Sequence, residues 1–270
     1  MRKVTKYSLS LRKIRHKMTE THFPLDDSPH FRLLELGEVT STNDYLRHYR
    51  PAEERRLTLA TAEHQTAGRG SGRNRWESAP GQNLLFSLLV RPRHIPAHAM
   101  FVLSEVMALS IREALNCQLK IKWPNDIYYA DRKLCGMLIE NDLQGTHVER
   151  SILGVGINVN QTQFSPSIPN PISLAQILGH EVERRFVLER VVEHFTRYYD
   201  WAEQGRLADI HQLYLDGLYR LGEEHPFRDS SGPFRATIVG VEPTGHLLLA
   251  DAQGARRRYA FKEVEYVIND

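Results

Sequence analysis

The stretch Leu84-Leu-Phe-Ser-Leu-Leu-Val90 constrains the fold more than any other part of the chain. Six of its seven residues are apolar, which is typical of a strand buried inside a sheet. It is far shorter than the roughly 18 to 20 apolar residues that a membrane-spanning helix needs. With 41% hydrophobic and 25% charged residues among 270, the chain has the composition of an ordinary soluble globular protein. We therefore predict a sizeable folded core that contains this strand.

Patterns typical of strands and of helices alternate along the chain, which predicts an α/β (α+β) fold with a mixed sheet and flanking helices. After residue 221 the pattern changes to short strands separated by turns, as in a small SH3-like barrel. We predict a polar, disordered leader over residues 1–30, a large domain over 31–221 and the barrel over 222–270. The expected strands are 31–36, 57–62, 84–90, 119–122, 127–129, 134–140, 148–159, 234–241, 246–250, 256–261 and 264–268, and the expected helices are 45–48, 96–115, 174–178, 187–199 and 207–219.

The net charge of +2 comes from the N-terminal segment. Residues 1–17 hold seven lysines and arginines and no acid, so the other residues carry 28 bases against 33 acids. A body built to bind nucleic acid would keep a positive charge without this tail, so no DNA partner is expected. The segment lacks the apolar core of a secretory signal, although its composition is also that of an organelle transit peptide, and Met18 offers an alternative start.

The two cysteines, Cys117 and Cys135, are too few to staple a chain of this length. A reducing compartment is the simplest interpretation, and we predict a cytoplasmic protein with no membrane partner. Neither the cysteines nor the histidines show the spacing of a metal site, so no metal ligands are predicted.

The loop from Gln65 to Trp76 reads Gln-Thr-Ala-Gly-Arg-Gly-Ser-Gly-Arg-Asn-Arg-Trp. Its glycines permit sharp turns that bring backbone N–H groups close to an anion, and its arginines can pair with phosphate or carboxylate. A short Gly-rich pattern is a weak signal by itself, and a solvated surface loop explains it equally well.

A second motif, Lys122-Trp-Pro-Asn-Asp126, follows the apolar end of a predicted strand, where open sheets place ligand sites. Lys133 comes seven residues later and precedes an apolar strand whose Gly136 would let a ligand approach the backbone. Asn158 stands inside a further strand pattern, where asparagine is depleted, and this invites a ligand explanation. Taken singly, each of these features has an equally good structural explanation, namely an Asx turn or a solubilising charge.

Together, these motifs closely resemble those of the biotin protein ligase family over most of residues 31–268. The carrying residues are Ser41-Thr-Asn43, the loop 65–76, Lys122 to Asp126, Arg132-Lys-Leu-Cys-Gly136 and the stretch 154–158. Lipoate ligases share the fold in outline, but their Arg-Arg and Gly-Gly-Gly signatures are missing here. The resemblance implies a class II synthetase-like catalytic domain over 31–221, followed by the SH3-like barrel.

The family joins biotin to ATP, giving biotinyl-5′-AMP and pyrophosphate, and then transfers biotin to one lysine of a biotin carboxyl carrier protein. The resemblance implies ATP with Mg²⁺, and biotin and the carrier domain as partners. Lys133 would bridge the biotin carboxylate and the α-phosphate, Arg69 would offset their repulsion, and Asp126 would receive the acceptor lysine. The remaining expected biotin-site residues are Ser41, Thr42, Asn43 (which would also cap and orient its turn), Gln65, Gly68, Gly70, Ser71, Gly136 and Gly156, and the expected ATP or adenylate residues are Arg73, Trp76, Lys122, Asn125 and Asn158.

The loop departs in two ways from the usual one, which reads Gly-Arg-Gly-x-Arg-Gly. Gly72 and Arg73 stand in reverse order, and Ser71 replaces an arginine or another long side chain. The effect on retention of the intermediate stays open. His64, beside Gln65, is interpreted as a structural histidine because no carboxylate in the sequence is spaced to orient it as a base.

Two other functions stay open beside biotin ligation. A lipoate or octanoate ligase would share the fold, and a nucleic-acid-binding regulator could act through the basic tail. Only about 30 residues precede the matching region, too few for a winged helix-turn-helix, so a monofunctional ligase is expected. The sequence leaves the oligomeric state open, a homodimer included, as well as the identity of the acceptor carboxylase.

Deletion of residues 1–17 should leave biotin ligation and the melting temperature almost unchanged, because this segment has little apolar surface to bury. Comparison of the two proteins by thermal unfolding and by acceptor biotinylation checks this. A loss of several degrees would show that the tail packs on the body.

Overall fold

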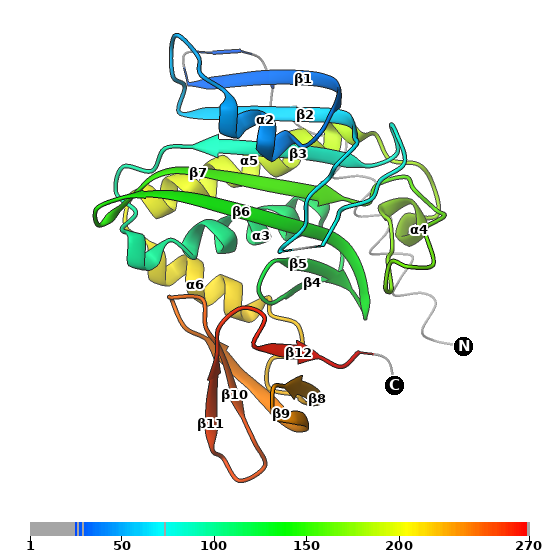
Figure 1. The fold of residues 1–270 in the computed structure, drawn as a ribbon, viewed down its shortest axis with the longest axis vertical. Coiled ribbons are helices and arrows are strands. Elements are labelled where there is room, and N and C mark those ends of the chain that lie inside the picture. The colour runs from blue at the N-terminus through cyan, green and yellow to red at the C-terminus, as the bar shows by residue number, and fades with distance from the viewer. Residues whose placement is uncertain (1–24, 26, 29, 73, 269–270) are drawn as a thin grey trace.

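The computed structural model describes residues 25, 27–28, 30–72 and 74–268, so the predicted leader lies almost entirely outside the described residues. A seven-stranded mixed sheet forms the centre, in the order β1-β2-β3-β7-β6-β5-β4 (Figure 1). Strands β1 and β2 are parallel, and every other neighbouring pair is antiparallel. The strands are β1 (Phe31–Val39), β2 (Leu57–Gln65), β3 (Leu84–Val90), β4 (Leu119–Lys122), β5 (Asp126–Tyr129), β6 (Arg132–Gln144) and β7 (His147–Ile157).

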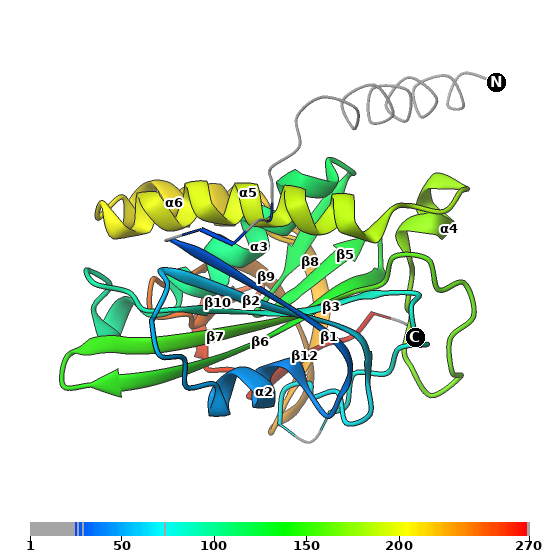
Figure 2. The same ribbon diagram turned by 90° about the horizontal axis from the view of Figure 1, so that it is seen from above.

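Helices cover the two faces of this sheet unequally (Figure 2). The long helices lie on one face, where apolar side chains from α3 and α5 pack with those of the sheet in one core. The short helix α2 lies on the opposite face. The helices are α2 (Thr42–His48), α3 (Val102–Leu115), α4 (Leu174–Leu178), α5 (Arg184–Glu203) and α6 (Leu207–Asp216), with a 3₁₀ turn at Ala97–Ala99.

A second sheet of five antiparallel strands follows α6 and fits the predicted SH3-like fold. It lies beyond the β4 edge of the first sheet (Figure 1). Trp123 joins the two parts, because its buried indole N–H donates to the carbonyl of Gly245 at 2.9 Å. The order is β11-β10-β9-β8-β12, with β8 (Glu224–Asp229), β9 (Gly232–Val241), β10 (Leu247–Ala250), β11 (Arg256–Tyr259) and β12 (Val264–Tyr266).

The predicted mixed fold is confirmed, and three elements differ most from the sequence prediction. The helix predicted over 96–115 is divided, because a 3₁₀ turn at Ala97–Ala99 precedes α3, which begins at Val102. The last helix ends at Asp216 instead of residue 219, because Leu218 forms an isolated parallel bridge with Ile121 of β4, and Tyr219 donates its backbone N–H to the carbonyl of Ile121. The strand β8 was not predicted, since Pro226 and its charged neighbours argue against a strand in the sequence. Among the described residues, no helix is both long and apolar enough to cross a membrane.

Candidate functional site

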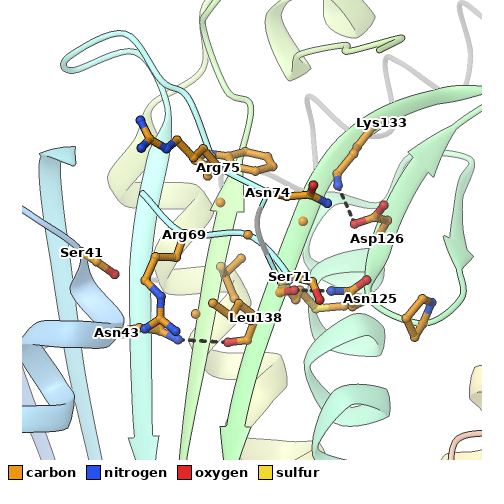
Figure 3. Close-up of a pocket in the computed structure, with 18 of the residues that line it drawn as sticks. Ser41, Asn43, Arg69, Ser71, Asn74, Arg75, Asn125, Asp126, Lys133 and Leu138 are labelled. Carbon is orange, nitrogen blue, oxygen red and sulfur yellow. Dashed lines mark hydrogen bonds and ion pairs between the residues drawn. The ribbon is translucent and has the colours of Figure 1, made fainter. Parts of the chain in front are cut away.

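The site is a cavity on the α2 face of the large sheet. Figure 3 shows it running from Ser41 and Arg69 on one side to Lys133 and Asp126 on the other. The loop after β2 covers it, and Phe261 of the second sheet closes the end near β4. Its lining residues are Ser41, Thr42, Asn43, Gln65, Arg69, Gly70, Ser71, Asn74, Arg75, Trp76, Lys122, Pro124, Asn125, Asp126, Lys133, Gly136, Met137, Leu138, Gly154, Val155, Gly156 and Phe261.

A polar network forms the α2 end of the cavity. Gln65 Oε1 accepts from the backbone N–H of Thr42 at 2.7 Å and from its hydroxyl at 3.1 Å. The Thr42 hydroxyl also lies 2.7 Å from that of Ser87, which donates to Oδ1 of Asn43 at 2.6 Å. Buried polar groups held this way keep fixed orientations. This end can therefore recognise a ligand that has its own donors and acceptors.

Ser41, and not Asn43, caps helix α2. The hydroxyl of Ser41 accepts from the backbone N–H of Asp44, whereas Asn43 lies inside the helix and is 3% exposed. Its amide Nδ2 donates to the carbonyl of Leu138 and to Glu140. The expectation that Asn43 caps the turn is therefore wrong, because serine already fills the capping position.

The guanidinium of Arg69 is held by two carboxylates at the same end. Nη1 lies 2.5 Å from Asp44 and Nη2 lies 2.8 Å from Glu140. Glu140 also pairs with Arg47 of α2 at 2.6 Å, so it ties the loop to the helix. The sequence motifs did not reveal Asp44 and Glu140, because their role depends on contacts between distant segments. The positive charge of Arg69 is thus largely compensated within the protein.

The covering loop is a small hairpin with its own backbone hydrogen bonds. Gly70 donates to Asn74, and Trp76 donates to Gly68 at 3.0 Å. Arg69 and Arg75 face each other as an isolated antiparallel bridge. Gly68 belongs to this hairpin and does not line the cavity, while Arg73 lies outside the described residues.

The indole of Trp76 lies flat on two glycines of the sheet. A Cβ on Gly156 would lie 2.3 Å from Cε2 of this ring, and one on Gly136 would lie 3.0 Å from Cζ3. Only glycine leaves this space at Gly156. The indole Nε1 is buried and has no hydrogen-bond partner among the described residues, so it can donate to a bound ligand.

Lys133 and Asp126 form an ion pair at 2.7 Å on the side of the cavity opposite Ser41, as Figure 3 shows. Neighbouring strands β5 and β6 hold them together. Asn125 is fixed beside them, since its amide Nδ2 donates to the carbonyl of Met137. Burial lowers the pKa of Lys122, whose ammonium lies 4.4 Å from the ring centre of Tyr266. Two lysines therefore stand close to one carboxylate.

A second cavity adjoins the first and shares Asn74, Arg75, Trp76 and Lys133 with it. Asn158 lines this second cavity and not the first. The amide Nδ2 of Asn158 donates to the carbonyl of Ile172 at 3.1 Å, which holds the far wall against β7. This wall was not predicted from the sequence, although its closely spaced prolines could have indicated it. Its residues are Phe164, Ser167, Ile168, Pro169 and Pro171.

The structure brings together nearly all of the predicted site residues. Those around the first cavity are Ser41, Thr42, Asn43, Gln65, Arg69, Gly70, Ser71, Trp76, Lys122, Asn125, Asp126, Lys133, Gly136 and Gly156. His64 points elsewhere and pairs with Glu38 of the adjacent strand at 2.9 Å. The argument that no carboxylate orients His64 is therefore wrong, because the parallel pairing of β1 with β2 places Glu38 beside it.

Among the described residues, no group of three or more His, Cys, Asp or Glu side chains could hold a metal ion. Asp126 is the acidic residue among those that line the first cavity.

The sequence and fold match known ligases. The model of the biotin/lipoate A/B protein ligase family matches residues 36–158. The bifunctional ligase/repressor BirA of Bacillus subtilis is 33% identical over 211 residues, which cover 75% of this chain and 64% of that protein. The biotin–[acetyl-CoA-carboxylase] ligase of Paracoccus denitrificans is 29% identical over 203 residues, covering 72% of this chain and 84% of that protein.

A solved structure agrees with these sequence matches. The biotin protein ligase from Aquifex aeolicus in complex with biotin and ATP superimposes with a TM-score of 0.73 at 27% identity, covering 88% of this chain and 99% of that one. The chain spans less than two thirds of the length of the Bacillus relatives, 64% of each. The shared motifs lie within the matched region and surround one cavity. Over residues 36–158 the chain therefore contains a domain that matches the biotin/lipoate A/B protein ligase family.

Proposed function

We propose that the protein ligates biotin to a lysine of a biotin carboxyl carrier protein, through a biotinyl-5′-AMP intermediate. The observation that carries this is the single cavity that joins a polar end at Thr42 and Gln65 to the cations Lys133 and Lys122. The polar end suits the ureido ring of biotin, which has both donors and acceptors. A lipoate dithiolane ring has neither, so this end favours biotin over lipoate.

The first step joins two anions, and the site supplies charges that offset their repulsion. A carboxylate oxygen of biotin attacks the α-phosphorus of ATP, and the bond from that phosphorus to pyrophosphate breaks. Lys133 is placed to hold both reacting groups, since it borders both cavities. The nucleoside would occupy the second cavity, against Trp76 and Phe164. Mg²⁺ would enter on the triphosphate and neutralise part of its charge.

The second step needs a nearby group that attracts a lysine. The acceptor lysine, an ammonium at neutral pH, first loses one proton. Its neutral amine then attacks the acyl carbon of the intermediate, AMP leaves with the electron pair of the broken bond, and the nitrogen loses a second proton. Asp126 can orient the incoming ammonium and accept the first of these protons, because its side chain is partly exposed at the cavity. Its pairing with Lys133 must loosen for this, so binding of the intermediate phosphate by Lys133 prepares the second step.

The direct test is incubation with biotin, MgATP and an isolated biotin carrier domain, followed by detection of acceptor biotinylation. Parallel reactions with lipoate and octanoate test the related acyl ligases. Acceptor labelling only with biotin supports the proposal, and labelling only with lipoate or octanoate overturns it. A gel shift with full-length protein and with protein that starts at Met18 tests a nucleic-acid-binding function.

Limited trypsin digestion should report ligand binding at the loop. Arg75 is exposed and free to be cleaved, whereas the ion pairs of Arg69 slow cleavage there. We expect cleavage to divide the chain into pieces of about 8 and 23 kDa, and biotin with MgATP to protect more than biotin alone. Protection has a chemical purpose, because water would hydrolyse the mixed anhydride. Equal cleavage rates with and without both ligands would exclude ligand-dependent ordering of the loop.

A further inference from the structure

Lys262 lies in the turn between β11 and β12 and belongs to none of the motifs of the site. Its ammonium sits against the tip of the covering loop. A Cβ placed on Gly72 would lie only 1.9 Å from Nζ of Lys262. The preceding residue, Phe261, lines the cavity and makes an edge-to-face contact with Trp123. The turn between β11 and β12 therefore supplies part of the cavity wall and places a cation beside the covering loop.

Lys262 forms no ion pair within the described residues, and it shares this property with Arg75 and Lys122 of the cavity wall. Its ammonium Nζ lies 5.6 Å from the ring centre of Phe261. Arg69 is held by two carboxylates, and Lys133 is paired with Asp126. Lys262 is thus available to bind an anion without first breaking an ion pair.

The backbone of Lys262 adds a second observation. Its φ of 72° is in the left-handed region, which side chains other than glycine rarely adopt. A lysine there reduces the stability of the turn compared with glycine. Unfavourable conformations of this kind persist where the surrounding structure imposes them and often mark functional positions.

The geometry of the displacement at phosphorus indicates which anion would lie near Lys262. In a displacement at phosphorus, the attacking and leaving oxygens lie roughly in line. Biotin would enter from the Thr42 and Gln65 end, so the leaving group would point along the same cavity toward Lys122 and Phe261. In the proposed function the nucleoside would occupy the second cavity, to the side of this line. The end near the second sheet is therefore the place for pyrophosphate.

We propose that Lys262 binds the β- and γ-phosphates of ATP and the pyrophosphate that leaves, while Phe261 shields them from solvent. This rests on the proposed adenylate-forming function and adds to it a residue of the second sheet. Such a residue acts on the first step alone, because pyrophosphate has left before the acceptor lysine reacts.

The test uses the full-length protein and three substitutions. Lys262→Met keeps the length of the side chain and removes the charge, and Lys262→Arg keeps the charge. We expect Lys262→Met to raise the KM for ATP about tenfold, with a similar rise in the pyrophosphate concentration for half-maximal ATP–pyrophosphate exchange. The KM for biotin and the transfer of biotin from supplied biotinyl-5′-AMP should not change. Lys262→Arg should stay within about threefold of the wild type.

Lys262→Gly separates a binding role from a structural one. Glycine adopts this φ without the strain that a side chain causes, so Tm should stay the same or rise by about 2 °C. ATP binding should weaken as it does in Lys262→Met. The proposal is overturned if Lys262→Met leaves the KM for ATP and the half-maximal pyrophosphate concentration unchanged. It is also overturned if this variant slows transfer of biotin from supplied biotinyl-5′-AMP by the same factor. Equilibrium dialysis with labelled ATP measures the Kd for ATP of the variant and of the wild type, and their ratio tests the inference even if the wild type does not use biotin. Failure of the proposed function and failure of this inference are therefore distinguishable.

Discussion

Replacement of Lys133 by alanine is expected to slow adenylate formation about 10²-fold or more, the scale for loss of one preorganised charge stabiliser. In the proposed reaction the ammonium of Lys133 would hold both reacting groups, because Lys133 borders the two cavities. Its removal also leaves Asp126 without its partner at 2.7 Å, and this carboxylate would then repel the triphosphate. Pyrophosphate release at saturating biotin and MgATP measures the effect, and Tm reports whether the fold is intact.

Lys120→Ala is the matched control for this substitution. Lys120 lies on β4, is exposed and does not line either cavity, so its loss should leave pyrophosphate release unchanged. A Lys133→Ala variant with near-normal release would remove Lys133 from the catalytic residues. A large drop in Tm would instead indicate a structural role, and supplied biotinyl-5′-AMP would then show whether transfer survives.

Local signals in the sequence predicted much of the fold. The apolar run Leu84–Val90 is a buried strand with the predicted bounds, and Ser173 caps the helix Leu174–Leu178 through a complete capping box with Gln176. Contacts between distant segments explain the failures, as at Tyr219, which pairs with β4. The domain boundary at residue 222 stays a prediction.

The site was predictable to the extent that its residues stand in compact motifs. Lys122 to Asp126 and Lys133 come together because β4, β5 and β6 are consecutive antiparallel strands, so short spacing in the sequence becomes proximity in space. Glu140 could not be found this way, since its partners Arg69 and Arg47 lie on the covering loop and on α2. Lys262 lies beyond any motif, and only the packing of the second sheet reveals it.

Gly156→Ala is expected to reduce the rate of adenylate formation by about 10- to 100-fold. The added Cβ would lie 2.3 Å from Cε2 of Trp76, and the backbone cannot retreat because β7 is paired on both sides, with Leu85 and Gly136. The indole of Trp76 must therefore move away from its position between the two cavities. Overpacking of this kind costs about 1–3 kcal/mol, and about 1.4 kcal/mol corresponds to a factor of ten.

A double-mutant cycle with Trp76→Ala tests whether the ring carries this effect. If it does, Gly156→Ala should cost almost nothing once the ring is absent, because the added methyl then meets open space. Gly37→Ala is the control for an added methyl on a strand, since Gly37 is exposed on β1 and a Cβ there has no neighbour within 4 Å. An equal cost of Gly156→Ala with and without the indole would show that the glycine serves the ligand directly. In that case Trp76 would not be the element that joins the biotin end of the site to the nucleotide end.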